Sequence, residues 1–223
     1  MPEQADDVTE QGGDDWATRA EARVLASALR LAPELGWTWR LAIAAGAAVG
    51  LSRGETELLV PGGPRDLAAL HARACDAAVL EALSEVDPAR LKVRERIRRG
   101  VLAWLDAASA EEAATRRWSG FLALPAHAAL GLRLAWGTAD LIWVWAGDTA
   151  TDENHYSKRA LLTGILIGAL AVRLADGEVA ARDFVDRRIQ NVMDFERFKG
   201  RLGGLRLGER AAAAAGRARF GRL

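Results

Sequence analysis

The sequence predicts an all-α protein, and three observations lead to that fold class. Ala, Leu and Arg dominate the 223 residues, with one tyrosine and few β-branched residues, a composition that favours helix over strand. Apolar residues recur at helical spacing, as at Val24, Ala28, Leu31 and Leu35. Gly, Pro and capping pairs divide the chain into segments of helical length, and none of them is a convincing strand. We expect nine or ten helices and no repeat of fixed period.

The first elements are short and have clear ends. A helix over 16–35 stops at Gly36, and Thr38 can cap the helix that follows. Ser52, with Glu55 three residues later, is a capping-box match that predicts a third helix. The spacing of these helices is typical of the helix-turn-helix of TetR-type proteins.

A larger helical bundle follows. We expect its helices at 64–83 after the break at Pro61-Gly62-Gly63-Pro64, at 88–105, from 109 to the break at Leu124-Pro125, at 130–145, at 156–174 before the stop at Asp176-Gly177, and at 179–198. The helices 130–145 and 156–174 are strongly apolar, and a short polar turn joins them. A polar turn at the mouth of an apolar interior suits binding of an apolar molecule better than catalysis.

The charges balance overall but are placed unevenly. Residues 1–15 carry six acids and no base, and we expect a disordered acidic tail there. Residues 197–223 carry eight bases and one acid. We therefore divide the chain into the tail 1–15, a helix-turn-helix-like region 16–85, a lipid-binding and dimerisation domain 86–198, and a basic segment 199–223.

The sequence predicts no targeting segment and no membrane span. The acidic start is unlike a signal peptide. The uncharged helical run 160–172 has thirteen residues, whereas a spanning helix needs about 20. The single cysteine, Cys75, fits a reducing compartment. We expect a cytoplasmic protein.

The candidate recognition helix argues against DNA binding. It offers Arg53 to bases or phosphates, but also Glu55 and Glu57, whose carboxylates would repel a phosphate backbone. We expect a scaffold that binds no specific DNA. A TetR-type transcriptional regulator with an apolar effector is the alternative.

No motif predicts catalysis, a cofactor or a metal. Asp152-x-x-His155 has the spacing of half a di-iron site, but neither His71 nor His127 has an acid three residues before it. A nucleophile elbow, a P-loop and a zinc-protease motif are all missing from the sequence. Cys75 has no base beside it in sequence and is expected in the core. We expect a protein that is not an enzyme.

Three of the eight tryptophans lie on the helix before the polar turn. Trp136 and Trp143 are seven residues apart and share a face, whereas Trp145 is turned about 160° from Trp143. One face can pack on the core while another lines a cavity, and core packing of all three is the alternative. We predict a lipid site that includes Trp136, Trp143, Leu132 and Ile167.

The basic end mixes arginines with Leu and Phe. This pattern is typical of a helix lying on anionic lipid, and we predict membrane contact through Arg206, Arg210, Arg217 and Phe220. A solvated basic tail is the alternative. The pair Gly203-Gly204 argues against one continuous helix.

Several motifs together resemble one family. They are Pro61-Gly62-Gly63-Pro64, Leu124-Pro125, Leu130-Gly131-Leu132-Arg133, Ala146-Gly147-Asp148-x-x-Thr151-Asp152-x-Asn154-x-Tyr156-x-x-Arg159-Ala160 and Asp186-Arg187-Arg188-Ile189-x-x-Val192-Met193. Over roughly residues 20–200 the chain resembles the TetR-like accessory proteins of ubiquinone (coenzyme Q) biosynthesis, the ninth-named Coq family, in their alphaproteobacterial form.

The resemblance implies a TetR-like fold without DNA-binding function, which binds isoprenoid lipid in its C-terminal domain. It also implies a homodimer, peripheral to the inner membrane of a bacterium, that presents a quinone intermediate to a ring hydroxylase. The family's partner-facing patch maps to Asp140, Ile142, Asp152, His155 and Tyr156. Of these, His155 stands where tryptophan is common, and Ile142 replaces a methionine of eukaryotic members. Because Tyr156 lies four residues after Asp152, both would lie on one side of a helix.

Overall fold

The chain folds into helices joined by short turns. A computed structural model describes the backbone of residues 4–148 and 153–220 and the side chains of residues 16–148 and 155–191. Within these ranges there is no strand, and the elements are α1 (Gln4–Leu35), α2 (Trp39–Ala48), α3 (Arg53–Leu59), α4 (Pro64–Ala82), the 3₁₀ turn η1 (Pro88–Arg90), α5 (Val93–Ser109), α6 (Glu112–Ala123), α7 (Ala128–Trp145) and α8 (Glu153–Phe220). The predicted all-α, TetR-like architecture is confirmed.

The predicted number of helices was slightly too high. The described residues form eight α-helices rather than nine or ten, because two predicted helices join in α8. Gly177, at φ 87° and ψ −175°, interrupts the helical backbone where the stop was predicted, and the chain re-enters a helix directly. The helix then continues through Gly203 and Gly204, where we had expected a break. Glycine lowers helix propensity by only about 1 kcal/mol, which need not end a helix.

The starts of the short helices follow the predicted local chemistry. The Thr38 hydroxyl accepts a hydrogen bond from the Leu41 backbone N–H at 3.3 Å. Ser52 and Glu55 form the complete capping box, with bonds of 3.2 and 2.8 Å. At the start of α4, Gly63 adopts φ 54° and Pro64 occupies the first helical turn. A side chain at Gly63 would collide with the Trp39 ring, so this turn requires glycine.

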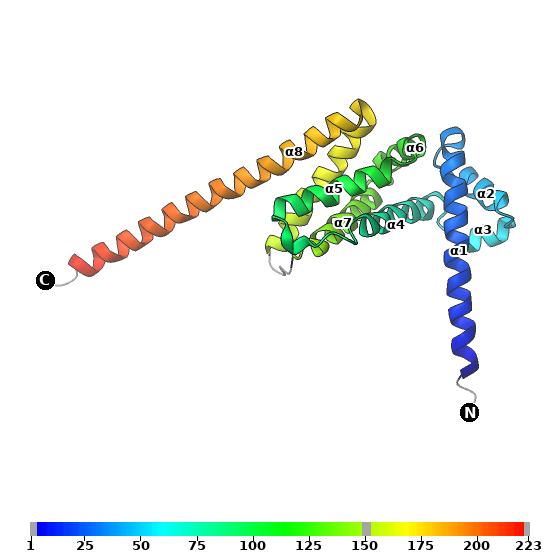
Figure 1. Cartoon of the computed structure of the whole chain (residues 1–223), viewed down its shortest axis with the longest axis horizontal. Helices are drawn as coiled ribbons and strands as arrows, with labels where there is room; N and C mark the ends of the chain where they lie inside the picture. The colour runs from blue at the N-terminus through cyan, green and yellow to red at the C-terminus, as the bar shows by residue number, and fades with distance from the viewer. Residues whose placement is uncertain (1–3, 149–152, 221–223) are drawn as a thin grey trace.

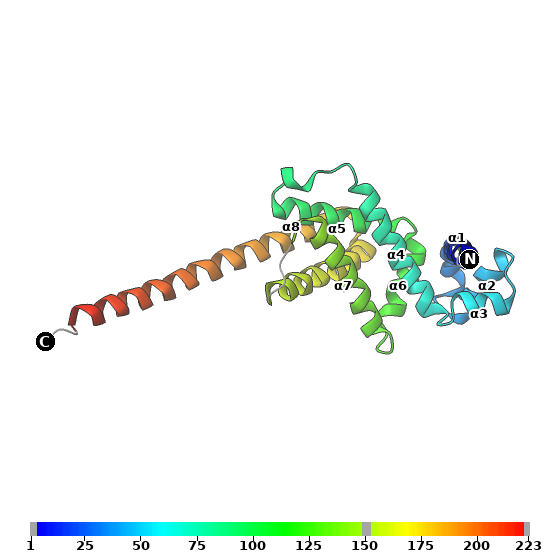
Figure 2. The ribbon, with the colours of Figure 1, turned by 90° about the horizontal axis from the view of Figure 1, so that it is seen from below.

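Helices α1–α3 form one end of the molecule, and α4 leads from them into the bundle of α5–α8 (Figures 1 and 2). One cluster of buried apolar residues extends through both parts. Two indoles connect these parts through α4. Trp37, just before α2, donates from Nε1 to the Pro64 carbonyl at 2.8 Å, and Trp118 of α6 donates from Nε1 to the Ala68 carbonyl at 3.2 Å. His71 lies between these rings, with centroid distances of 6.1 and 5.0 Å.

Cys75 lies in this core, as expected. It is 4 % exposed, and its sulfur is 4.0 Å from the His71 ring nitrogens. Burial raises the pKa of the Cys75 thiol to about 12 and lowers the pKa of His71 to about 4. Both groups are therefore neutral at physiological pH, and the pair packs rather than reacts.

One described helical stretch, His155–Asn191, is long and apolar enough to cross a membrane by length and composition. A helix in the core of a soluble protein can have the same length and composition. Its buried side, which includes Leu162, Leu166 and Leu170, packs on the bundle. Its other side includes the exposed Leu161 and Ile167.

Candidate functional site

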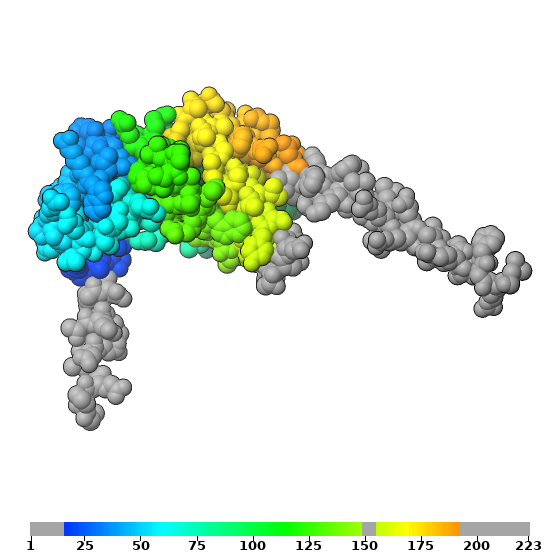
Figure 3. All heavy atoms as spheres, turned by 180° about the vertical axis from the view of Figure 1, so that it is seen from behind, coloured from blue at the N-terminus to red at the C-terminus, as the bar shows by residue number. Residues whose placement is uncertain are grey.

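An apolar cavity of about 520 Å³ opens between α6, α7 and α8. The green surface of α6 and α7 borders the yellow surface of α8 on the side seen in Figure 3. The lining is aliphatic and aromatic apart from two hydroxyl residues, and it consists of Ala72, Trp104, Trp118, Ser119, Gly120, Leu122, Ala123, Ala128, Gly131, Leu132, Leu134, Ala135, Thr138, Ile167, Leu170, Ala171 and Leu174. A cavity of this size and character is typical of sites for small apolar ligands.

A second cavity of about 330 Å³ lies between α5, the end of α7 and α8, and we call it the basic-rimmed cavity. Its walls include Ile97, Leu162, Ile165 and Ile189. Its rim carries the charged side chains of Arg94, Arg96, Lys158 and Asp148. The two cavities therefore differ in chemistry, since the first is apolar and the second places cations beside apolar walls.

The four predicted lipid-binding residues do not share one cavity. Leu132 and Ile167 line the apolar cavity, Trp143 lines the basic-rimmed cavity, and Trp136 lines neither. Trp136 and Trp143 do share a face of α7, but seven residues separate them by about 10 Å along the helix axis. Sequence reasoning also missed the contribution of Trp104 and Trp118, because they come from helices far away in the chain.

A buried ion network closes the turn between α7 and α8. Arg159 is 2 % exposed, and its Nε donates to Asp140 at 2.5 Å while its Nη1 donates to Asp148 at 3.1 Å. Lys158 Nζ donates to the other Asp148 oxygen at 2.6 Å. The charges of these two cations and two carboxylates therefore balance. Asp148 lies near the beginning of the loop motif 146–160, and Lys158 and Arg159 lie near its end.

The same network positions Trp143 and Asp148. The Trp143 indole donates to the Lys158 carbonyl at 3.2 Å, and the Lys158 ammonium lies 5.2 Å from the Trp143 ring centre. Burial by itself would raise the pKa of Asp148, but the hydrogen bonds and charges of Lys158 and Arg159 outweigh it and the pKa falls below its ordinary value. Asp148 is therefore held as a carboxylate.

The exposed part of the predicted partner patch is aromatic. Tyr156 is 64 % exposed, and its ring packs edge-on against His155 at 5.1 Å and lies 6.5 Å from Trp136. Asp140 is half-exposed and bonded to Arg159. Asp152 lies outside the described residues, and so does Thr151, which we had expected to cap the helix.

Ile142 does not lie on the exposed surface, as the predicted partner patch requires. It is fully buried in α7, and it lies so close to α5 that a Cβ on Gly100 would approach its Cγ2 to 2.6 Å. A residue in this position contacts the core rather than a partner. The glycine on α5 that makes room for it could not be connected with Ile142 from sequence alone.

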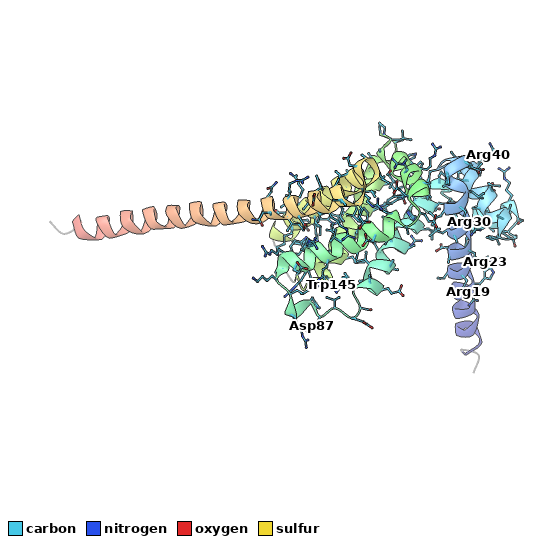
Figure 4. All side chains as sticks on the ribbon, turned by 45° about the horizontal axis from the view of Figure 1, so that its top comes forward. Arg19, Arg23, Arg30, Arg40, Asp87 and Trp145 are labelled. Carbon is cyan, nitrogen blue, oxygen red and sulfur yellow. The ribbon has the colours of Figure 1, made fainter. Side chains whose placement is uncertain are left out.

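The charged side chains of the candidate recognition helix, α3, contact groups within or next to the same helix. Arg53 pairs with Glu57 at 2.8 Å, and the Glu55 carboxylate accepts the Ser52 backbone N–H. We had expected both carboxylates to face phosphates, but Glu55 is engaged in the capping box. Arginines do gather elsewhere in this region, since Figure 4 places Arg19, Arg23 and Arg30 along α1 with Arg40 beyond them on α2.

Two further predictions concern the basic segment 199–223 and metal binding. Arg206, Arg210, Arg217 and Phe220 lie on the last part of α8, and their side chains are outside the described part of the chain. Among the side chains that the structure describes, no three His, Cys, Asp or Glu residues gather as metal ligands would.

Comparison with known proteins agrees with the resemblance found in the loop motif. Residues 128–196 match the profile of the COQ9 family. The chain is 29 % identical over 198 residues to the mitochondrial ubiquinone biosynthesis protein COQ9 of Xenopus tropicalis, covering 82 % of this chain and 61 % of that protein. It is 30 % identical over 183 residues to the protein of that name from Rattus norvegicus, covering 77 % and 58 %, and 27 % identical over 202 residues to that of Homo sapiens, covering 83 % and 63 %. The chain spans about three fifths of the length of these relatives. The predicted family resemblance is confirmed.

Proposed function

Because this chain is a relative of the COQ9 proteins, we propose that it is a non-catalytic accessory protein of ubiquinone biosynthesis. It binds an isoprenoid quinone intermediate and presents it to a ring hydroxylase. The observation that carries this proposal is the apolar cavity, because most of its lining comes from helices α7 and α8, inside the residues that match the family.

The size of the cavity fits the head of such a molecule. At roughly 30 Å³ per non-hydrogen atom, the share of a water molecule in the liquid, 520 Å³ holds about 17 atoms. This corresponds to one aromatic ring and about two isoprene units. A longer tail must leave the cavity past Leu132 and Ile167, which line it and are 56 % and 45 % exposed.

A second copy of the chain would cover the exposed tail. Leu132, Leu161 and Ile167 are exposed apolar side chains on α7 and α8, and Gly137 and Gly164 leave open space where a side chain would stand. Small residues beside exposed leucines allow helices of two subunits to approach closely. We therefore include a homodimer in the proposal.

The presentation step uses the surface around Tyr156. A large exposed ring that keeps a hydroxyl is a frequent interface hot spot. The buried Arg159 network fixes the start of α8, where Tyr156 is exposed. Asp140, Asp152 and His155 complete the proposed surface for the hydroxylase, and Ile142 is no longer part of it.

The proposed place of action is the cytoplasmic face of a bacterial inner membrane. Arg206, Arg210, Arg217 and Phe220 lie on a helical backbone, as an interfacial helix requires. Each Lys or Arg near an anionic surface contributes on the order of 1 kcal/mol. Deleting residues 200–223 is therefore expected to weaken binding to anionic liposomes without unfolding the domain, and equal binding by both forms would remove this membrane contact.

The lipid proposal is tested with a variant that fills the cavity. Ala135→Phe places a ring among the lining residues, whereas Ala129→Phe adds the same ring on the same helix at an exposed position outside the cavity. Solvent extracts of the purified proteins, analysed by mass spectrometry, should contain isoprenoid lipid for the wild type and Ala129→Phe but little for Ala135→Phe. A wild type without lipid, or equal loads in all three proteins, would refute the proposal.

The partner proposal is tested with Tyr156→Ala. Because Tyr156 is largely exposed, the variant should keep its melting temperature and lipid load but lose co-purification of the hydroxylase and lower cellular ubiquinone. Leu58→Ala, which removes another exposed apolar side chain at the far end of the molecule, is the matched control and should leave both readouts unchanged. Normal ubiquinone with folded Tyr156→Ala would remove this residue from the functional surface.

A TetR-type regulator with an apolar effector is the alternative, favoured by the three-helix N-terminal region. The charges of α3 argue against it, because its one cation, Arg53, is accompanied by the carboxylates of Glu55 and Glu57, which a phosphate backbone would repel. We propose that the chain binds no specific DNA. Selection from genomic fragments that returned a palindromic site with nanomolar affinity at physiological salt would promote the regulator function.

A further inference from the structure

The basic-rimmed cavity is apolar inside and charged at its opening. Ile97, Leu162 and Ile165 line it and are almost fully buried, so they form its inner wall. Val93 and Leu161 also line it but are about half exposed, which places them at the opening. A cavity of this kind fits a molecule with an apolar tail and a charged head.

Two arginines of α5 bring positive charge to the opening. Arg94 is exposed, and within the described part of the chain its side chain makes no hydrogen bond or ion pair. Arg96 is half-buried, and its guanidinium donates to the backbone carbonyls of Leu91 at 2.9 Å and Ala146 at 2.6 Å. These two bonds fix the guanidinium but do not balance its charge, and they leave three of its five N–H groups for another acceptor.

The acids nearby do not cancel these two charges. Both oxygens of Asp148 already accept hydrogen bonds, one from Lys158 at 2.6 Å and the other from Arg159 at 3.1 Å. Glu95 does not line the cavity, and it pairs with Arg99 at 3.3 Å. Because Asp148 and Lys158 balance each other, the charge that remains at the opening is that of the two arginines of α5.

The head and the size of a ligand follow from these features. Guanidinium groups bind carboxylates and phosphates through charge-assisted hydrogen bonds. At roughly 30 Å³ per non-hydrogen atom, 330 Å³ holds about 11 atoms. This is the volume of one chain of about ten carbons, and it is too small for the two chains of a membrane phospholipid.

We propose that the basic-rimmed cavity binds a single-chain anionic amphiphile. The carboxylate or phosphate head lies at Arg94 and Arg96, and the tail packs against Ile97, Leu162 and Ile165. The two cavities share no lining residue, so this site is separate from the one proposed for the quinone intermediate.

The head is tested by calorimetric titration with decanoate, decyl phosphate and the uncharged 1-decanol. Decanoate and decyl phosphate should bind about tenfold more tightly than 1-decanol, which is the lower end for a hydrogen bond to a charged group because the opening is exposed to solvent. Arg94→Gln should remove most of this preference and leave the affinity for 1-decanol unchanged. Arg30→Gln on α1 is the matched control, since it removes the same charge from another exposed side chain outside the cavity.

The tail is tested with hexanoate and inorganic phosphate. Hexanoate should bind more weakly than decanoate, by about fourfold for each CH₂ group that it lacks. Inorganic phosphate should not bind at the concentrations that saturate with decyl phosphate. Equal affinity for inorganic phosphate and decyl phosphate, or for hexanoate and decanoate, would mean a site for a small anion and would overturn the proposal.

The place of binding is tested with Ala135→Phe, which fills the other cavity and should leave the affinity for decanoate unchanged. Loss of decanoate binding in folded Ala135→Phe would assign the ligand to the apolar cavity and refute this site. Equal affinities for decanoate and 1-decanol, or equal losses in Arg94→Gln and Arg30→Gln, would refute the role of the arginines. None of these outcomes depends on the isoprenoid content of the purified protein, so the two proposals can fail separately.

Discussion

Replacing the buried Arg159 by methionine should destabilise the protein more than replacing any exposed arginine. Arg159 is almost fully buried and joins Asp140 and Asp148 across the turn between α7 and α8. Methionine keeps much of the apolar stem but removes the guanidinium and its hydrogen bonds. Asp148, whose side chain is 7 % exposed, would then keep only Lys158 as its partner.

The expected loss can be estimated from these contacts. Removing one partner of a buried ion pair costs about 3–5 kcal/mol, because the other charge stays buried. The lower end applies here, since the Asp140 side chain is 46 % exposed and solvent screens its interaction, and since Asp148 retains Lys158. We expect the free energy of unfolding to fall by about 3 kcal/mol. For a chain of this size the melting temperature should fall by roughly 6–12 °C.

The assay is urea and thermal unfolding followed by circular dichroism. The matched control is Arg98→Met, because Arg98 also makes two hydrogen bonds to one carboxylate, Asp186 of α8, but the two side chains are 35 % and 47 % exposed. That change should cost less than about 1 kcal/mol. Arg159→Lys should recover only part of the loss, because an ammonium lacks the planar fork that reaches two carboxylates.

Equal losses in Arg159→Met and Arg98→Met would refute this reasoning. They would mean that apolar packing, rather than the ion network, holds the turn between α7 and α8. A change in the urea dependence of the unfolding free energy, without a change in the midpoint, would instead indicate an altered denatured state.

Three further predictions concern the stability in acid, the reactivity of Cys75 and the packing of Gly100 against Ile142. Folding lowers the pKa of Asp148, so its contribution to the free energy of unfolding is present above its ordinary pKa and is lost as the pH falls through the lower folded pKa. When unfolding is measured between about pH 5 and pH 2, the free energy of unfolding should therefore fall less in Asp148→Asn than in the wild type. Cys75, with a pKa raised to about 12, should not react with a thiol reagent in the native protein near neutral pH but should react fully in urea, and fast labelling of folded protein would contradict its burial. Gly100→Ala should destabilise the protein by about 1–3 kcal/mol because its Cβ meets Ile142. Gly54→Ala on α3, with open space around it, should be neutral or stabilising, and similar melting temperatures for the two variants would mean that Ile142 does not pack against Gly100.

The sequence by itself determined the features that depend on near neighbours in the chain. The capping box of Ser52 and Glu55, the turn at Gly63-Pro64 and the interruption at Gly177 all lie where local chemistry predicted them. Such signals involve groups at most a few residues apart, so backbone geometry alone brings them together. The loop motif likewise indicated the family without any knowledge of the fold.

Only the tertiary structure decided how those helices share their side chains. It divided the four predicted lipid-binding residues between two cavities and the surface, and it added Trp104 and Trp118 to the lining. It also buried Ile142 against α5 and made Arg159 the centre of an ion network. These outcomes depend on contacts between residues far apart in the chain, and helical periodicity predicts which face a residue occupies but not which helix that face meets.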